Sequence, residues 1–432
     1  MRRFLKFLIV SIIIVVVAFG VFRFSNQYRM NTLKNNISWS VAYKNCKNAV
    51  AFDRAENKDT YLAYDNYIKV IKEDGREETL LQDKSLKIEN IVYHNNKLYF
   101  ISQSTLYEYD IVNKELKQIL DKIPSEGKYL DRNLIIKDSK ILLAIGSATN
   151  SGVATDDGSY PINKIPYDRS SIDITLNGFN YGDKKTGAFM PYGNSSIEGQ
   201  RIKAQDLGNS CIIEINLNNN KETLYATGIR NITGWDLDSE GSLIGIIGGM
   251  ENIGERPINR DFDYLYEIDK GKWYGWPDFS GGDPITSPRF KEDRVVSNLI
   301  SNPPNKTVAA PIYQYSDVGI IRYLAIDRDG NILGKNTKVY FDKKENVISE
   351  ISSDNVISDL LKLKDTSQIK GIKYSEGHIY ILDSGIGCIY KLQSEDFNLK
   401  FNLPNSVWIF ICAFLFTLTC IVIYKFHSKK FK

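Results

Sequence analysis

Histidine, the side chain best suited to proton transfer near neutral pH, is scarce in this sequence. The chain has 432 residues and only three histidines, His94, His378 and His427. The first two fall in equivalent turns of a repeated pattern, and the third lies in a basic tail. None of them is placed to act as a general base. A neutral tyrosine is a poor substitute, because its pKa of about 10 would have to fall by roughly three units.

The five cysteines indicate neither a zinc site nor a disulfide framework. Cys412 and Cys420 belong to a long apolar run, and Cys46, Cys211 and Cys388 have no metal-like spacing. Three thiols cannot all pair, so we expect these three to be small buried residues. A bridge between Cys46 and Cys388 stays open as an alternative if the chain closes into a ring.

The elements that must position any site are short strands. Between the two ends of the chain, segments rich in Val, Ile, Tyr and Thr alternate with turns of Asn, Asp, Gly and Lys. One plan recurs: an apolar strand, a polar turn, a second apolar strand, and a third that ends in an Ile-Tyr-x-Leu-like step. In the copy that begins at Tyr323, the second strand is expected at Ile332 and Leu333. The other copies begin near Ala49, Ile91, Leu134, Trp235 and Ile372.

Six such copies predict an all-β, six-bladed β-propeller, in which each four-stranded blade packs against its neighbours. A β-sandwich is the alternative, although its strands need not repeat in the same internal order. Two long stretches, Ser147–Ser210 and Gly248–Phe290, break the period. Loops of this length in a compact domain are usually functional or disordered.

Several motifs in the repeated region occur together. They are Gly146–Gly152 (GSATNSG), Thr227–Gly234 (TGIRNITG), Gly254–Pro257 (GERP), Asp263–Ile268 (DYLYEI) and Trp273–Gly282 (WYGWPDFSGG). This set resembles the bacterial glucose/sorbosone dehydrogenases, six-bladed propellers related to the soluble quinoprotein glucose dehydrogenase. The resemblance extends over residues 49–392, and its Tyr-Gly-Trp-Pro block is highly specific.

The resemblance implies a cofactor site at the mouth of the central channel. Active members of the family bind pyrroloquinoline quinone (PQQ) and calcium there, and oxidise an aldose or aldehyde by hydride transfer. The cofactor is a polyanionic quinone, so cations must hold it, and a histidine base takes the substrate proton. The family's cofactor-binding Arg-Asn pair falls on Arg230 and Asn231, and Asp263 is the candidate calcium ligand. Hydrogen bonding between blades is the alternative role for both Arg230 and Asp263.

Three positions depart from the family. Thr233 stands where the glucose enzymes have a glutamine. The segment expected to carry the catalytic histidine, residues 127–132, has none, and Tyr129 is at the expected base position. A second family histidine is replaced by Tyr315. These departures predict lost dehydrogenase activity.

Both ends of the chain carry apolar runs. Phe4–Phe22, as a helix, would span about 28 Å and could anchor the chain in a bilayer, with a cleaved signal peptide as the alternative. Ser406–Tyr424 has 19 uncharged residues followed by a basic tail, and a buried core helix is the alternative. Basic residues flank the outer ends of both runs, which predicts that both termini are cytoplasmic. The expected division is an anchor over 1–29, an extracytoplasmic propeller over 30–400, and a transmembrane helix with its tail over 401–432.

The charge of the middle region argues against a nucleic-acid partner. Eight of the 55 Lys and Arg residues lie at the two ends, which leaves 47 basic against 52 acidic residues and a net charge of about −5.

The resemblance and its departures lead us to expect one of two functions. The first is a non-catalytic membrane-anchored propeller that binds a carbohydrate or another cell-envelope ligand or partner. The alternative is a PQQ- and calcium-dependent sugar or aldehyde dehydrogenase that uses a tyrosine or water as its base.

Overall fold

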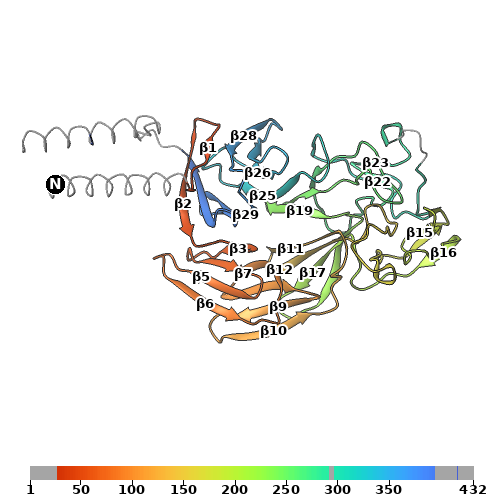
Figure 1. Cartoon of the computed structure of the whole chain (residues 1–432), viewed down its shortest axis with the longest axis horizontal. Helices are drawn as coiled ribbons and strands as arrows, with labels where there is room; N and C mark the ends of the chain where they lie inside the picture. Colours follow the sequence, from red (N-terminus) through yellow and green to blue (C-terminus); the bar gives the residue numbers. More distant parts are fainter. Residues whose placement is uncertain (1–26, 291–295, 395–415, 417–432) are drawn as a thin grey trace, which may run out of the picture. The chain divides into compact units, whose positions relative to one another are not determined.

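Six sheets follow one another along the chain, and each forms one blade of a β-propeller (Figure 1). The computed structural model describes residues 27–290, 296–394 and 416, and the six sheets lie within Met30–Ser394. The first strand of each blade contacts the first strands of its two neighbours, and the sixth blade in this way meets the first. The ring is closed, so the predicted six-bladed all-β fold is confirmed.

In each blade the first strand lies nearest the central axis and the last strand lies at the outer edge. The strands of blades 1 to 3 are β3 (Ala51–Arg54), β4 (Thr60–Ala63), β5 (Tyr67–Ile71) and β6 (Glu77–Gln82); β7 (Ile88–His94), β8 (Lys97–Ser102), β9 (Thr105–Asp110) and β10 (Glu115–Leu120); β11 (Tyr129–Lys137), β12 (Lys140–Ser147), β17 (Cys211–Asn216) and β18 (Glu222–Thr227). Those of blades 4 to 6 are β19 (Ile232–Leu237), β20 (Leu243–Ile247), β21 (Tyr264–Glu267) and β24 (Tyr313–Gln314); β25 (Ile321–Asp327), β26 (Thr337–Asp342), β27 (Val347–Ile351) and β28 (Ile357–Lys362), with β1 (Asn31–Thr32) beside β28; and β29 (Ile369–Ser375), β30 (His378–Asp383), β31 (Cys388–Ser394) and β2 (Ile37–Lys44).

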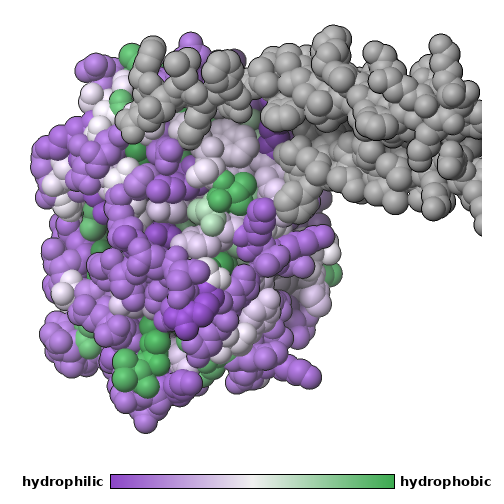
Figure 2. Space-filling view, turned by 90° about the vertical axis from the view of Figure 1, so that its left-hand side faces the viewer, coloured by the Kyte–Doolittle hydropathy of each residue, from purple (hydrophilic) through white to green (hydrophobic). Residues whose placement is uncertain are grey.

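The core lies between neighbouring blades. One hydrophobic cluster joins blades 1 and 2, another joins blades 2 and 3, and a third joins blades 3 and 4. Strands such as β8 are therefore buried on both faces, whereas the outer strands β6 and β10 are mostly exposed and polar. The face shown in Figure 2 is correspondingly hydrophilic, with only small apolar spots among the coloured residues.

Turn chemistry explains the hairpins between first and second strands. Asn95 and Asn96 have φ angles of 49° and 60°, and Asp138 and Ser139 have 50° and 56°. Two consecutive residues with positive φ make the tight turn whose twist matches a β-hairpin.

The ring is closed by the first long strand of the described region. β2 pairs with β31, with Ile37 opposite Ser394 and Lys44 opposite Cys388. Just beyond β2, the Cys46 N–H donates to the Gly387 carbonyl (3.0 Å). Among the described residues, Cys46, Cys388 and Cys211 are buried and their thiols are free. The expectation of small buried residues is met, and the bridge between Cys46 and Cys388 is not formed.

One strand is misplaced by the sequence pattern. Ile332 and Leu333 lie in a loop, and the second strand of blade 5 is β26, which begins at Thr337. The reason is Asp327, whose carboxylate accepts the backbone N–H groups of Asn331 (3.1 Å), Ile332 (2.9 Å) and Leu333 (2.8 Å). Backbone groups held by a side chain in this way are not free to form a sheet ladder.

The two long stretches are insertions that share a core of their own. The first, between β12 and β17, contains four short strands. The second is divided by β21 of blade 4 into one part between β20 and β21 and another between β21 and β24. Both lie on the side of the molecule where β15, β16, β22 and β23 are labelled (Figure 1). We call residues 148–209, 249–263 and 268–312 the cap, because one hydrophobic cluster joins these three segments. Its elements are η1 (Ile162–Lys164), β13 (Ile174–Asn177), β14 (Asn180–Tyr181), β15 (Thr186–Gly187), β16 (Glu198–Ile202), β22 (Phe279–Ser280), β23 (Asp283–Pro284) and η2 (Pro288–Phe290).

Both apolar runs predicted to cross a membrane lie outside the described residues, apart from Phe416. Within the described part of the chain, no helix combines the length and apolar character that a bilayer crossing requires.

Candidate functional site

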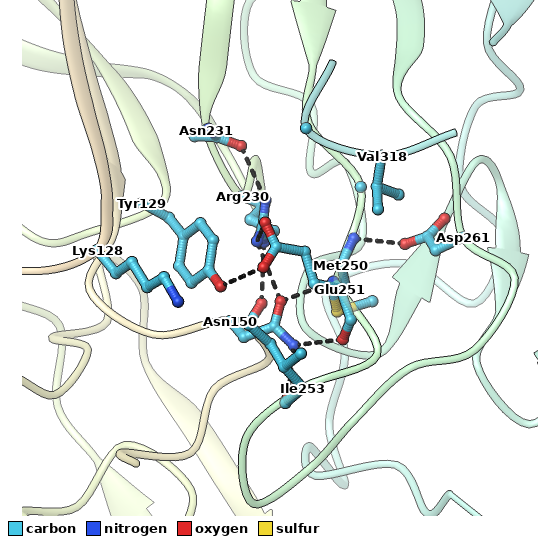
Figure 3. Close-up of polar contacts among 12 residues, drawn as sticks. Lys128, Tyr129, Asn150, Arg230, Asn231, Met250, Glu251, Ile253, Asp261 and Val318 are labelled. Carbon is cyan, nitrogen blue, oxygen red and sulfur yellow. Dashed lines mark hydrogen bonds and ion pairs between the residues drawn. The ribbon is translucent and has the colours of Figure 1, made fainter. Parts of the chain in front are cut away.

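The residues singled out by sequence come together where the first strands of blades 3 and 4 begin. Tyr129 is the first residue of β11, and Arg230 and Asn231 directly precede β19. The cap adds Asn150, shortly after β12, and Glu251, shortly after β20 (Figure 3). β12 passes very close to this point, because a Cβ atom on residue 146 would lie 2.1 Å from the Tyr129 carbonyl oxygen. Only glycine fits there.

Arg230 is buried, and each of its three side-chain nitrogen atoms donates a hydrogen bond to a protein group. Its Nε and Nη2 atoms donate to the backbone oxygen (3.1 Å) and side-chain oxygen (3.0 Å) of Asn150. Its Nη1 atom donates to Asn231 Oδ1 (3.3 Å), and Glu251 Oε1 lies 4.0 Å from Nη2. The guanidinium carbon also lies 3.7 Å from the centroid of the Tyr129 ring, which covers it. Arg230 therefore connects blade 4 to Asn150 and Glu251 of the cap, and a cofactor-binding role remains a prediction.

Tyr129 acts in this site as a hydrogen-bond donor. Its hydroxyl donates to Glu251 Oε2 (2.8 Å), and its side chain is buried. Burial raises the pKa of Tyr129 well above its usual value, by more than the Arg230 guanidinium lowers it. The phenol is therefore neutral near pH 7 and cannot accept a substrate proton there.

Asn231 extends the polar network across three blades. Its Nδ2 atom donates to Asp131 (2.6 Å), and Asp131 in turn pairs with Arg322 of β25 (3.2 Å). Thr233 of β19 donates to the Ile321 carbonyl of β25 (2.8 Å) and so links blades 4 and 5, whereas Arg322 links blade 5 to blade 3. These contacts make the innermost residues of blades 3, 4 and 5 a single hydrogen-bonded frame.

The Asp263 carboxylate is surrounded by backbone N–H groups. It is fully buried, and its carboxylate accepts the N–H groups of Gly249 (3.2 Å), Gly319 (2.9 Å), Ile320 (3.0 Å) and Ile321 (3.1 Å). Among the described residues, no cluster of three His, Cys, Asp or Glu side chains could hold a metal. Asp263 thus makes hydrogen bonds of the kind that connect neighbouring blades. A role as a calcium ligand remains a prediction.

The remaining candidates for a base lie elsewhere. Tyr315 is packed edge-on against Tyr313 and Tyr340, and burial raises its pKa well above the usual value. His94 ends β7 and His378 begins β30, so both lie at the turn that follows a first strand. The site lies at the opposite end of the first strands, so neither imidazole reaches it.

A cavity of about 140 Å³ opens beside this site. It is lined by Tyr129 and Tyr160 together with polar groups that include Asn150, Thr155 and Asp157. We call it the mouth cavity. It combines aromatic faces with hydrogen-bonding groups, which suits a small polar ligand.

A polyanionic quinone does not fit the residues present. Its carboxylates would need accessible cations, but Arg230 is covered by Tyr129 and bonded to Asn150 and Asn231. A further cation, Lys128, lines the mouth cavity, and it lies 4.0 Å from the Asp157 carboxylate. The Glu251 carboxylate would also repel an anion at this place. We therefore derive no reaction step that uses the quinone from this arrangement of residues.

Sequence reasoning missed Glu251, Asp131 and Arg322, and it assigned no role to Asn150. Their position in the sequence was the one signal that could have found Asn150 and Glu251. Each follows closely the second strand of a blade, where an insertion begins. Their meeting at Arg230 depends on the path of the cap, which no periodic pattern encodes.

No family model matches the sequence, and no curated protein matches it. Solved structures do resemble it. The PQQ domain of pyranose dehydrogenase from Coprinopsis cinerea is 10% identical, with a TM-score of 0.55 over 85% of this chain and 97% of that one. A Trichoderma reesei enzyme of carbohydrate-active enzyme family AA12 is 11% identical, with a TM-score of 0.57 over 85% and 97%. The PQQ-bound aldose sugar dehydrogenase of Streptomyces coelicolor is 12% identical, with a TM-score of 0.52 over 84% and 99%. The chain thus has the six-bladed propeller fold of the PQQ-dependent sugar dehydrogenases, as its motifs predicted.

Proposed function

We propose that this protein is a membrane-anchored, extracytoplasmic propeller that binds a carbohydrate at the mouth cavity and has no sugar dehydrogenase activity. The observation that carries the proposal is that the Arg230 side chain is already bound by other protein groups and covered. Arg230, the cation that would hold the quinone, is covered by Tyr129 and bonded to Asn150 and Asn231, and neither described histidine, His94 or His378, lies nearby.

The lining of the mouth cavity supports a carbohydrate as the ligand. Tyr129 and Tyr160 offer aromatic surface for the C–H face of a sugar ring, while Asn150, Thr155 and Asp157 offer partners for hydroxyl groups. Solved propellers of this fold include enzymes named for pyranose and aldose substrates.

Calorimetry on the purified full-length chain in detergent tests this directly, with a panel of mono- and oligosaccharides. We expect binding of at least one sugar, and a tenfold or greater loss of affinity in Tyr160→Ala. Tyr374→Ala is the control, because Tyr374 lies in β29 at the opposite end of the first strands. No binding by any sugar, or an equal loss in both variants, would refute carbohydrate binding at this cavity.

The alternative is a PQQ- and calcium-dependent sugar or aldehyde dehydrogenase. The fold and the presence of the Arg230–Asn231 pair favour it. The test is to add the quinone and calcium to the same protein and to follow dye reduction over a panel of aldoses and aldehydes. We expect no reduction, and turnover would establish the alternative.

The proposal of two membrane anchors is supported by the closure of the ring. Ile37 of β2 lies opposite Ser394 of β31, so the chain enters and leaves the propeller at one place. Two apolar runs connected there suit a single membrane. We expect the protein to stay in the membrane fraction after an alkaline carbonate wash, with the propeller cut by external protease. Release into the soluble fraction would refute anchoring.

A further inference from the structure

A second, larger cavity of about 460 Å³ lies beside the mouth cavity. One wall is the linker between blades 2 and 3, residues 122–126, with Ser104, and the other is residues 163–167 of the cap with Arg169 and Asn209. We call it the basic cavity, because Lys122, Lys164 and Arg169 line it. Among its described lining residues, Glu126 is the only carboxylate.

These three cations have no carboxylate partner in the described part of the chain. Lys122, Lys164 and Arg169 are exposed, and none forms an ion pair with a described carboxylate. The middle of the chain has more acidic than basic residues, so three unpaired cations around one hollow stand out from their surroundings. A concave surface lined by charge of one sign attracts the opposite charge.

Both walls of the basic cavity are held in place by buried contacts. In the cap, the Arg169 N–H donates to Asn209 Oδ1 (3.0 Å), and Asn209 Nδ2 donates to the Gly146 carbonyl (3.0 Å). In the linker, Ile123 is buried and its N–H donates to the Ser104 carbonyl (2.9 Å). The cations therefore project from fixed backbone, which lowers the entropic cost of binding.

Pro166 lines the mouth cavity and the basic cavity alike. The two cavities therefore adjoin at Pro166, and a ligand would need more than one sugar ring to reach both. The guanidinium of Arg169 suits bidentate binding of a carboxylate or phosphate, and the two lysines add point charges.

We infer that the basic cavity binds the anionic group of an acidic saccharide whose neutral part occupies the mouth cavity. This inference rests on the proposed function and names the class of its ligand. Carboxylate and phosphate groups share the required chemistry, and the choice of probes separates them.

The test uses the full-length protein and titrates four probes: trigalacturonate, its methyl ester, a phosphorylated maltotriose, and inorganic phosphate. We expect one of the two acidic saccharides to bind at least tenfold more tightly than the methyl ester. The combined variant Lys122→Gln, Lys164→Gln and Arg169→Gln should abolish this preference and leave binding of the ester unchanged. Raising the salt concentration should weaken only the acidic probe.

The control variant combines Lys184→Gln, Lys185→Gln and Lys203→Gln, which removes the same charge from exposed positions of the cap outside both cavities. It should behave like the natural protein, and thermal unfolding should show that both variants are folded. Equal binding of acidic and neutral saccharides would overturn the inference while the proposed function stands. Binding of inorganic phosphate alone, lost in the first variant, would show a separate anion site and end the proposed link to a saccharide.

Discussion

Asp168 is a buried carboxylate that fastens the first insertion to the end of β12. Its oxygens accept the N–H groups of Ala148 (2.6 Å) and Thr149 (3.2 Å), and the side chain is fully buried. Burial raises the pKa of Asp168 to about 6, although these hydrogen bonds oppose the shift. The charged form is therefore costly in the folded protein.

This shift predicts a stability that falls as the pH rises. The folded state binds the Asp168 proton more tightly than the unfolded chain, so the contribution is largest below about pH 4 and is lost as the pH passes 6. We expect Asp168→Asn to cost about 2 kcal/mol more at pH 4.5 than at pH 7. Urea unfolding of both proteins at the two pH values measures the difference. The same cost at both would show that the carboxyl group is not shifted.

Tyr129 contributes to the site through its ring and through its hydroxyl, and the two can be separated. Tyr129→Phe keeps the ring over Arg230 but removes the bond to Glu251, so the free energy of unfolding should fall by about 1 kcal/mol. Tyr129→Ala also uncovers the buried guanidinium and leaves a cavity, with an expected loss of about 3 to 5 kcal/mol. Urea unfolding checks both values. Similar losses in the two variants would mean that stacking on Arg230 contributes little.

At the scale of elements, the cap is held by one buried ion pair. The Arg256 guanidinium lies 3.1 Å from the Asp278 carboxylate, and both side chains are buried. Arg256 also donates to the carbonyl groups of Ser151 (2.8 Å) and Ser297 (3.0 Å), so it joins all three segments of the cap. Asp278 accepts the N–H groups of Leu299 and Ile300 as well.

Breaking this pair should loosen the cap and spare the blades. Arg256→Met leaves Asp278 buried without its counter-charge, a change that typically costs about 3 to 5 kcal/mol. We expect faster amide hydrogen exchange throughout the cap and unchanged exchange in β8 and β30. Arg201→Met, at an exposed arginine of β16, is the control and should have no effect. Uniformly faster exchange in the blades would show that the cap and the propeller unfold together.

The hairpins were predictable because their determinants are local. The polar turns around Asn95 and Asp138 supply the positive φ angles that tight turns need, and the alternating apolar segments on either side form the strands. The strand at Ile332 was misplaced for a reason that is equally local but competing. Asp327 captures three backbone N–H groups, and an apolar pair beside such a residue forms a loop.

At the scale of the whole molecule, stability depends on closure between β2 and β31. Ile37 of β2 is 2% exposed, whereas Leu33, just before β2, is 51% exposed. We expect Ile37→Asp to lower the free energy of unfolding by about 3 kcal/mol, because it buries an unpaired charge at the closure. Leu33→Asp should change it little. Denaturant unfolding followed by tryptophan fluorescence compares them, and equal effects would show that closure contributes little to stability.

The sequence by itself determined the ring of six blades. Each hairpin depends on turn residues and on apolar alternation within a few neighbouring positions, and repetition of that unit specifies a propeller. The motifs also located Arg230, Asn231 and Tyr129 in one region.

Only the tertiary structure decided what surrounds Arg230. Asn150 and Glu251 reach it from two irregular insertions, and their positions depend on how those insertions pack on each other. The same packing forms part of the lining of both cavities, while Tyr129 of β11 covers the guanidinium. Long-range contacts of this kind leave no periodic trace in a sequence, because each is fixed by the whole path of the chain between the residues it joins.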